Sequence, residues 1–152
     1  MKGRVFAGLV IGVVLGWASL LAADDAREEA AKKDLKAFAG KWKNTFVERD
    51  GKKAPAEELV NVFVTHEGNK VTVRVGDKVV VQGTIELDPT KKPKTVDFTS
   101  TAPDNKGQIY LGIYEFTGDS YRLCLADPGK KRPTEFSSKL GALIVYTREM
   151  EK

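Results

Sequence analysis

Few side chains in this sequence have the types needed for nucleophilic or acid–base chemistry. The chain of 152 residues contains one histidine, His66, and one cysteine, Cys124. A catalytic pair requires the two side chains to lie within hydrogen-bond reach, with a third group orienting the base. His66 ends one expected strand and Cys124 lies in the middle of another, with no orienting motif. We therefore predict no catalytic pair, and we expect His66 to be exposed before a turn.

Cys124 is expected to be a buried structural thiol. A single cysteine cannot form a disulfide within the chain. The alternative is a reactive thiol, because Arg122 lies two residues away on the same strand face and a nearby cation lowers a thiol pKa.

The acidic and basic residues match no motif for a metal, a phosphate or a nucleophile. The acid pairs Asp24-Asp25 and Glu57-Glu58 lie in segments that we expect to be solvated, and no metal-ligand spacing occurs. No cluster of Lys and Arg alternates with aromatic residues, so a nucleic-acid partner is not predicted. The run Lys91–Lys94 is interpreted as a solvated turn, with an anion site as the alternative. We predict no metal, no cofactor and no enzymatic activity.

The aromatic residues supply the first candidate site. Tyrosine hydroxyls among apolar rings are typical of pockets that bind and orient a small ligand. The alternative is that these side chains fill the core completely. The candidate ligand-lining residues are Phe46, Tyr110, Tyr114, Phe116, Tyr121 and Tyr146.

A second candidate site lies in the segment Arg132–Phe136, RPTEF, within a long connection. Arg132 and Glu135 either bind a partner or tie this loop to the sheet. Phe136 either plugs the barrel or covers the outward face that carries Ile113 and Cys124.

These candidates are positioned by a hairpin at Gly107–Ala126. Gly118-Asp119 suits the primed two-residue turns that join hairpin strands. The predicted cross-strand pairs are Thr117 with Ser120, Phe116 with Tyr121, Glu115 with Arg122, Tyr114 with Leu123, and Ile113 with Cys124. Opposite charges and aromatic rings then face each other.

Alternating apolar residues and turn signals predict six further strands. They are Lys41–Arg49, Val60–His66, Val71–Val75, Val79–Leu87, Thr95–Thr101 and Gly141–Glu149. A three-residue loop, Gly76-Asp77-Lys78, keeps Val73 opposite Val81 and Val75 opposite Val79. Gly83 predicts a bend or bulge. Eight strands with hairpin-length links predict an all-β fold, an antiparallel up-and-down barrel over residues 40–150.

The N-terminal region predicts export. A basic start, Met1–Arg4, precedes the uncharged run Val5–Leu21 and a small-residue site at Ala22-Ala23. Residues 1–23 are interpreted as a signal peptide, with a retained membrane anchor as the alternative. The rest of the chain is then secreted or periplasmic. Residues 24–39 are expected to form a helical spacer, with acids first and lysines later, whose last turn docks through Leu35 and Phe38.

Composition is that of one soluble domain. Hydrophobic residues make up 41% and charged residues 30% of the chain, and the formal net charge is +4. Lys2 and Arg4 lie in the leader, so 23 basic residues face 21 acidic ones afterwards, a net charge of +2.

The sequence also carries a resemblance. Gly40-Lys41-Trp42, with Arg148 near the end of the last strand, is similar to the calycin (lipocalin-like) arrangement. There, a basic side chain lies across the indole at the closed end of the barrel, a cation–π contact. The alternative for Arg148 is a solvated charge.

More closely, the chain resembles a family of uncharacterised secreted proteins abundant in planctomycetes. The matching stretches are Gly40–Trp42, Asp50–Lys52, Leu87–Lys94, Leu111–Glu115, Gly118-Asp119, Leu123–Ala126, Arg132–Phe136 and Arg148-Glu149. This resemblance implies a lipocalin-like barrel, with Trp42 and Arg148 at its closure, and no activity.

The sequence thus predicts an extracytoplasmic, non-enzymatic module that binds a small apolar or amphipathic ligand. The alternative is a structural or protein-interaction module of the cell envelope with a filled core and an envelope protein as partner. Contact with a membrane is expected only through the N-terminal segment, if it is not cleaved.

Overall fold

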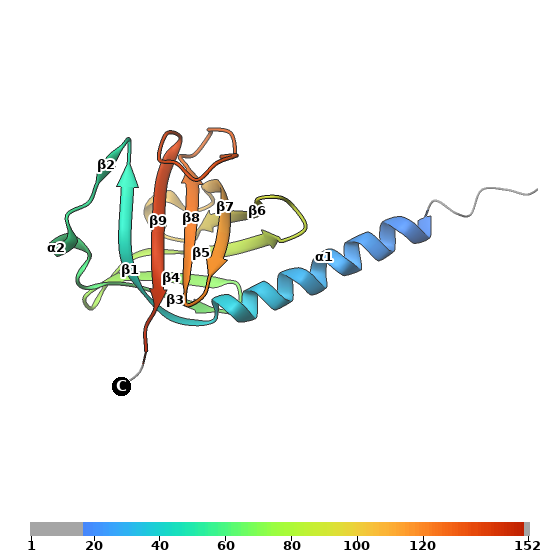
Figure 1. The fold of residues 1–152 in the computed structure, drawn as a ribbon, viewed down its shortest axis with the longest axis horizontal. Coiled ribbons are helices and arrows are strands. Elements are labelled where there is room, and N and C mark those ends of the chain that lie inside the picture. Colours follow the sequence, from blue (N-terminus) through green and yellow to red (C-terminus); the bar gives the residue numbers. More distant parts are fainter. Residues whose placement is uncertain (1–16, 151–152) are drawn as a thin grey trace, which may run out of the picture.

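The computed structural model describes residues 17–150, and it contains a closed antiparallel β-barrel of eight strands (Figure 1). The predicted all-β barrel with an N-terminal helix is confirmed. Each barrel strand pairs with the next in sequence, and the last returns to the first. The barrel strands are β1 (Gly40–Arg49), β3 (Val62–Glu67), β4 (Lys70–Val75), β5 (Lys78–Asp88), β6 (Lys94–Ser100), β7 (Ile109–Thr117), β8 (Ser120–Ala126) and β9 (Gly141–Arg148).

Within residues 17–150, three short elements lie outside the ring of eight strands. The two-residue strand β2 (Lys52–Lys53) pairs with the end of β1, after a turn at Asp50-Gly51. The helix α2 (Ala56–Leu59) follows Pro55, and a 3-10 turn spans Pro103–Asn105.

One long helix, α1 (Trp17–Phe38), precedes the barrel and meets it at its C-terminal end, while its other end projects away (Figure 1). Most of the predicted signal segment, residues 1–16, lies outside the described part of the chain, and residues 17–23 belong to α1. Leu20 and Leu21 are exposed. Within residues 17–150, no helix combines the length and apolar character needed to cross a bilayer.

The hairpin formed by β7 and β8 has the predicted turn and register. Gly118-Asp119 forms the loop, and the pairs run from Thr117 with Ser120 to Ile113 with Cys124. The Nε atom of Arg122 donates a hydrogen bond of 2.6 Å to Glu115.

The inner face of β1 differs from the prediction because the strand contains a bulge. The pairing of β1 with β9 shifts between Asn44 and Phe46. Because side chains alternate along a strand, one extra residue moves the following ones to the other face. Phe46 therefore pairs with the outward Val145 and lies outside the barrel, so its predicted place in a ligand site was wrong. Asn44 Oδ1 accepts a hydrogen bond from the backbone N–H of Phe46, which stabilises the bulge.

The turn between β4 and β5 has two residues rather than the predicted three. Val75 pairs with Lys78 across Gly76-Asp77, so the expected pairing of Val75 with Val79 was wrong. A bulge opposite Val73 and Arg74 then restores the predicted pairing of Val73 with Val81. The buried face is preserved because the extra residue, Val80, lies in the bulge of β5 and not in the loop.

Gly83 allows the Phe98 ring to approach the backbone of β5 closely, and it forms neither the predicted bend nor the predicted bulge. It pairs in regular register with both neighbouring strands, and the ring of Phe98 packs directly on it. A Cβ atom at Gly83 would lie 2.4 Å from the Phe98 ring and 2.4 Å from the carbonyl oxygen of Thr99.

We expect Gly83→Ala to lower the free energy of unfolding by roughly 1–3 kcal/mol, the usual cost of overpacking a core. Urea denaturation measures this change. The control is Val80→Ala on the same strand, whose side chain is exposed. Equal losses in the two variants would contradict the close contact between Gly83 and Phe98.

Candidate functional site

The barrel is closed at one end by a cluster of aromatic rings around Phe38. Phe38, the last residue of α1, is 2% exposed. Its ring centroid lies 4.6–5.3 Å from those of His66, Tyr114, Phe116 and Tyr121. These distances are typical of stabilising aromatic pairs. Tyr114 and Phe116 are thus packed against the plug that Phe38 forms.

Trp42 and Arg148 lie together at this closed end. The Arg148 guanidinium is 4.1 Å from the centre of the Trp42 ring, and it donates hydrogen bonds to the carbonyl oxygens of Ala37 and Ala39. The Trp42 indole N–H donates to the Phe38 carbonyl at 2.7 Å. These donors satisfy carbonyls at the C-terminus of α1 that have no partner within the helix. Arg148 is therefore not the free, solvated charge considered as the alternative.

A buried carboxylate fixes α1 to the barrel from the side. Asp34 Oδ2 accepts hydrogen bonds from the Tyr114 hydroxyl at 2.7 Å and from Lys94 Nζ at 2.8 Å. Burial, and then the bond to Asp34, raise the pKa of Tyr114 above its usual value. Tyr114 thus remains a neutral donor at any physiological pH.

Beyond this plug, the barrel interior contains a cavity of about 310 Å³. Phe38 lies in its wall at the closed end, and its mouth lies at the opposite end, beside Arg49 and Asp127. Of the predicted ligand-lining residues, Tyr110, Tyr121 and Tyr146 lie in the wall, whereas Tyr114, Phe116 and Phe46 do not. The apolar part of the wall consists of Val64, Val71, Val73, Val81, Ile85, Val96, Phe98, Leu123, Leu125, Ala142 and Ile144.

His66 lies in the cavity wall rather than at the surface, so the expectation that it is exposed was wrong. It is 5% exposed, and its Nε2 atom lies 2.9 Å from the Tyr121 hydroxyl. Burial lowers the pKa of His66 to about 4, so the imidazole is neutral at pH 7. The alternation of β3 contained the signal, because His66 is two residues after the inward Val64.

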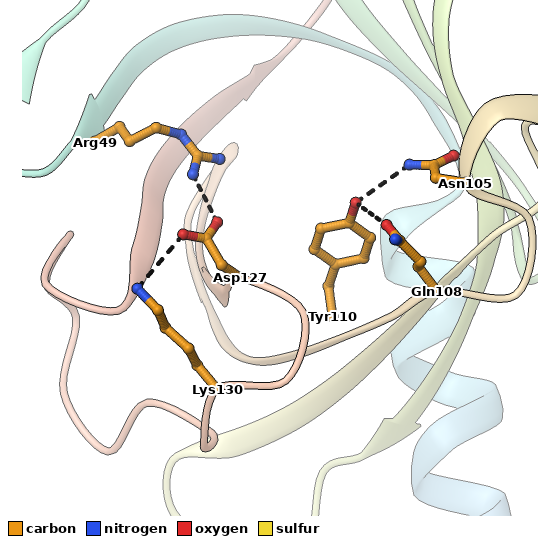
Figure 2. A network of polar contacts seen from close by, with 6 residues as sticks. All are labelled: Arg49, Asn105, Gln108, Tyr110, Asp127 and Lys130. Atoms are coloured by element: carbon orange, nitrogen blue, oxygen red, sulfur yellow. Dashed lines mark hydrogen bonds and ion pairs between the residues drawn. The ribbon is translucent and has the colours of Figure 1, made fainter.

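Two groups of polar side chains lie at the mouth of the cavity, and Figure 2 shows the contacts within each group. On one side, Asp127 pairs with Arg49 at 2.7 Å and with Lys130 at 3.8 Å. On the other, the Tyr110 hydroxyl accepts a hydrogen bond from Asn105 and donates one to Gln108, both at 3.2 Å. Both groups are partly exposed, so the ion pairs contribute little to stability. An apolar interior with a polar entrance is typical of sites for small organic ligands.

Of the residues at this mouth, the sequence predicted only Tyr110. Arg49 reaches the inner face only because of the bulge in β1. Asp127 belongs to the loop after β8, and Asn105 ends the 3-10 turn, so no alternating pattern indicates the direction of either side chain.

The loop between β8 and β9 covers the outside of the barrel. Arg132 donates hydrogen bonds to the carbonyl oxygens of Val96 and Gly112 and pairs with Asp97 at 2.7 Å. Cys124 is fully buried beneath this loop and donates its S–H to the Ser137 carbonyl. Burial raises the pKa of the Cys124 thiol, as expected for a structural rather than a reactive cysteine.

The other two residues of the second candidate site also lie on this outer side. Phe136 is half-buried under the Arg122 guanidinium, at 3.9 Å, and so does not plug the barrel. Glu135 is exposed and lies 3.7 Å from Lys139.

A larger hollow of about 480 Å³ lies on the outer surface, against α1, the β5–β6 turn and the loop after β8. Its charged residues are mostly engaged with each other. Arg27 lies 3.8 Å from Glu86, and Arg132 pairs with Asp97. This hollow therefore offers fewer free binding groups than its size indicates.

His66 and Cys124 do not form a catalytic pair, because His66 lies in the inner wall and Cys124 on the outer face of the barrel. Within residues 17–150, no three His, Cys, Asp or Glu side chains cluster as metal ligands do. Comparison of the chain with protein-family models, with curated proteins and with solved structures found no significant match.

Proposed function

We propose that this protein is a non-enzymatic module that binds a small apolar or amphipathic ligand inside the barrel. The observation that carries the proposal is the cavity of about 310 Å³, with apolar walls and a polar mouth. Its volume lies at the lower end of the range of roughly 300–1,000 Å³ for ligand pockets. Natural protein interiors are close-packed, so an internal space of this size favours an occupant.

We also propose that the protein is exported from the cytoplasm and that its barrel is lipocalin-like. The uncharged run near the N-terminus supports export, and the contact of Arg148 with Trp42 supports a lipocalin-like barrel. Membership of the planctomycete family remains a proposal that rests on the shared sequence motifs.

The alternative, an envelope interaction module, has less support. Arg132, one of its two key residues, binds backbone carbonyls of the sheet. A structural role accounts for these contacts without a partner.

Naphthalene tests the proposal, because its two fused rings are apolar and compact. We expect its fluorescence to report saturable binding at one site per chain. Leu123→Trp places an indole in the cavity wall and should weaken binding at least tenfold, by steric exclusion. The matched control is Leu111→Trp, which changes the same residue type on the neighbouring strand at a position outside the cavity wall. Absence of saturable binding, or equal binding by both variants, would overturn the proposal.

A further inference from the structure

Tyr146 presents an unused hydroxyl to the cavity. The residue is 5% exposed, and it forms part of the cavity wall. Its hydroxyl makes no hydrogen bond with any residue in the described range 17–150. It is also not one of the unpartnered polar atoms in this range that are sealed within the protein. The hydroxyl therefore opens onto the cavity.

The other hydroxyls near the closed end already have partners. Tyr121 is bonded to His66, and Tyr114 donates to Asp34. His66 Nδ1 has no partner among the described residues, but it is sealed within the wall. Tyr146 lies beside Tyr121, with ring centroids 5.1 Å apart, and Tyr121 packs on the Phe38 plug. The free hydroxyl is thus placed deep in the cavity rather than at its mouth.

The charged side chains of the cavity wall lie far from the hydroxyls at its closed end. The charged side chains in the cavity wall are Arg49 and Asp127, and both lie at the mouth. An ion bound at the closed end would lose its hydration without gaining an opposite charge, which is costly. A neutral polar group pays a much smaller cost and can bond to Tyr146.

The volume of the cavity limits the size of the ligand. An apolar cavity of about 150 Å³ is sufficient to bind benzene. The space of about 310 Å³ is twice as large and ends at the Phe38 ring. It accommodates a body of about two fused rings.

We infer that the ligand is a compact, neutral molecule of about this size, whose single hydrogen-bonding group enters first and bonds to the Tyr146 hydroxyl. This inference rests on the proposed function. It adds the orientation of the ligand and excludes ligands that require a charged end at the bottom of the cavity.

Calorimetry with naphthalene, 2-naphthol and 2-naphthoate tests this inference, because the three share one ring system. At pH 7 we expect 2-naphthol to bind about tenfold more tightly than naphthalene, the effect of one neutral hydrogen bond. We expect 2-naphthoate to bind more weakly than naphthalene. Tyr146→Phe should remove the advantage of 2-naphthol over naphthalene. The control, Tyr110→Phe at the mouth, should retain the advantage.

The outcomes separate this inference from the proposed function. If naphthalene and 2-naphthol bind equally, or if Tyr146→Phe retains the preference, the inference fails although the cavity binds ligands. Tighter binding of 2-naphthoate would also overturn it, and would place the polar end at Arg49. If none of the three compounds binds to the folded wild-type protein, the proposed function fails. A melting curve for each variant verifies that it is folded.

Discussion

Phe38→Ala is expected to lower the free energy of unfolding by about 3–5 kcal/mol, as for other large-to-small changes in a packed core. The Phe38 ring is almost fully buried and contacts four other rings at the closed end of the barrel. Its removal leaves a void that these neighbours cannot fill without distorting their strands. Chemical denaturation followed by circular dichroism measures the change.

Leu35→Ala is the matched control for Phe38→Ala. Leu35 lies one turn earlier on α1 and is only partly buried against the same core. Its truncation should cost clearly less than that of Phe38. Should the two variants lose the same stability, or should Phe38→Ala lose less than about 1 kcal/mol, Phe38 would not be the plug described above.

The second large effect is a pH dependence of stability caused by His66. Its pKa is about 4 in the folded protein because of burial, and near 6.5 in an unfolded chain. Between these values the unfolded state binds more protons, so stability rises with pH. Acidification from pH 7 to pH 4 should therefore remove about 3 kcal/mol of stability through this group.

This prediction can be assigned to one residue because the chain contains a single histidine. Urea denaturation at several pH values between 7 and 5 measures the effect before most carboxylates titrate. In His66→Gln, which stays neutral and can still bond to Tyr121, the slope in this window should vanish. Persistence of the wild-type slope in this variant would exclude His66 as its origin.

Much of the barrel was predictable because its signals are local. The β7–β8 register follows from a two-residue turn at Gly118-Asp119 and from strands that alternate without interruption. Turn chemistry and the side-chain period together leave one register possible there.

The bulges were not predictable from the same signals. In β1, the strand shifts by one residue because β9 closes the barrel against it, and nothing near Thr45 in the sequence indicates this. The bulge at Val80 in β5 likewise depends on the pairing of β5 with β4. The bulge in β1 reverses the inner and outer faces of the rest of that strand, which is why Phe46 was misplaced and Arg49 was missed.

The division of the interior into a plug and a cavity was also beyond the sequence. Tyr114 and Tyr110 belong to one face of β7, but only Tyr110 lines the cavity. The difference arises because α1 inserts Phe38 beside Tyr114, a long-range contact that no local pattern specifies. Helical spacing did place Leu35 and Phe38 on one docking face of α1.

The pairing of β1 with β9 has a consequence for biosynthesis. β1 lies against β9 from Trp42 to Arg49, and these strands are about a hundred residues apart in the chain. Contacts of such long sequence separation slow folding, because the intervening chain must be ordered first. While the polypeptide leaves the ribosome, the edge of β1 that pairs with β9 has no partner until β9 has emerged. The nascent chain therefore exposes unpaired strand edges that invite aggregation, and we expect it to depend on holding chaperones until its last strand is made.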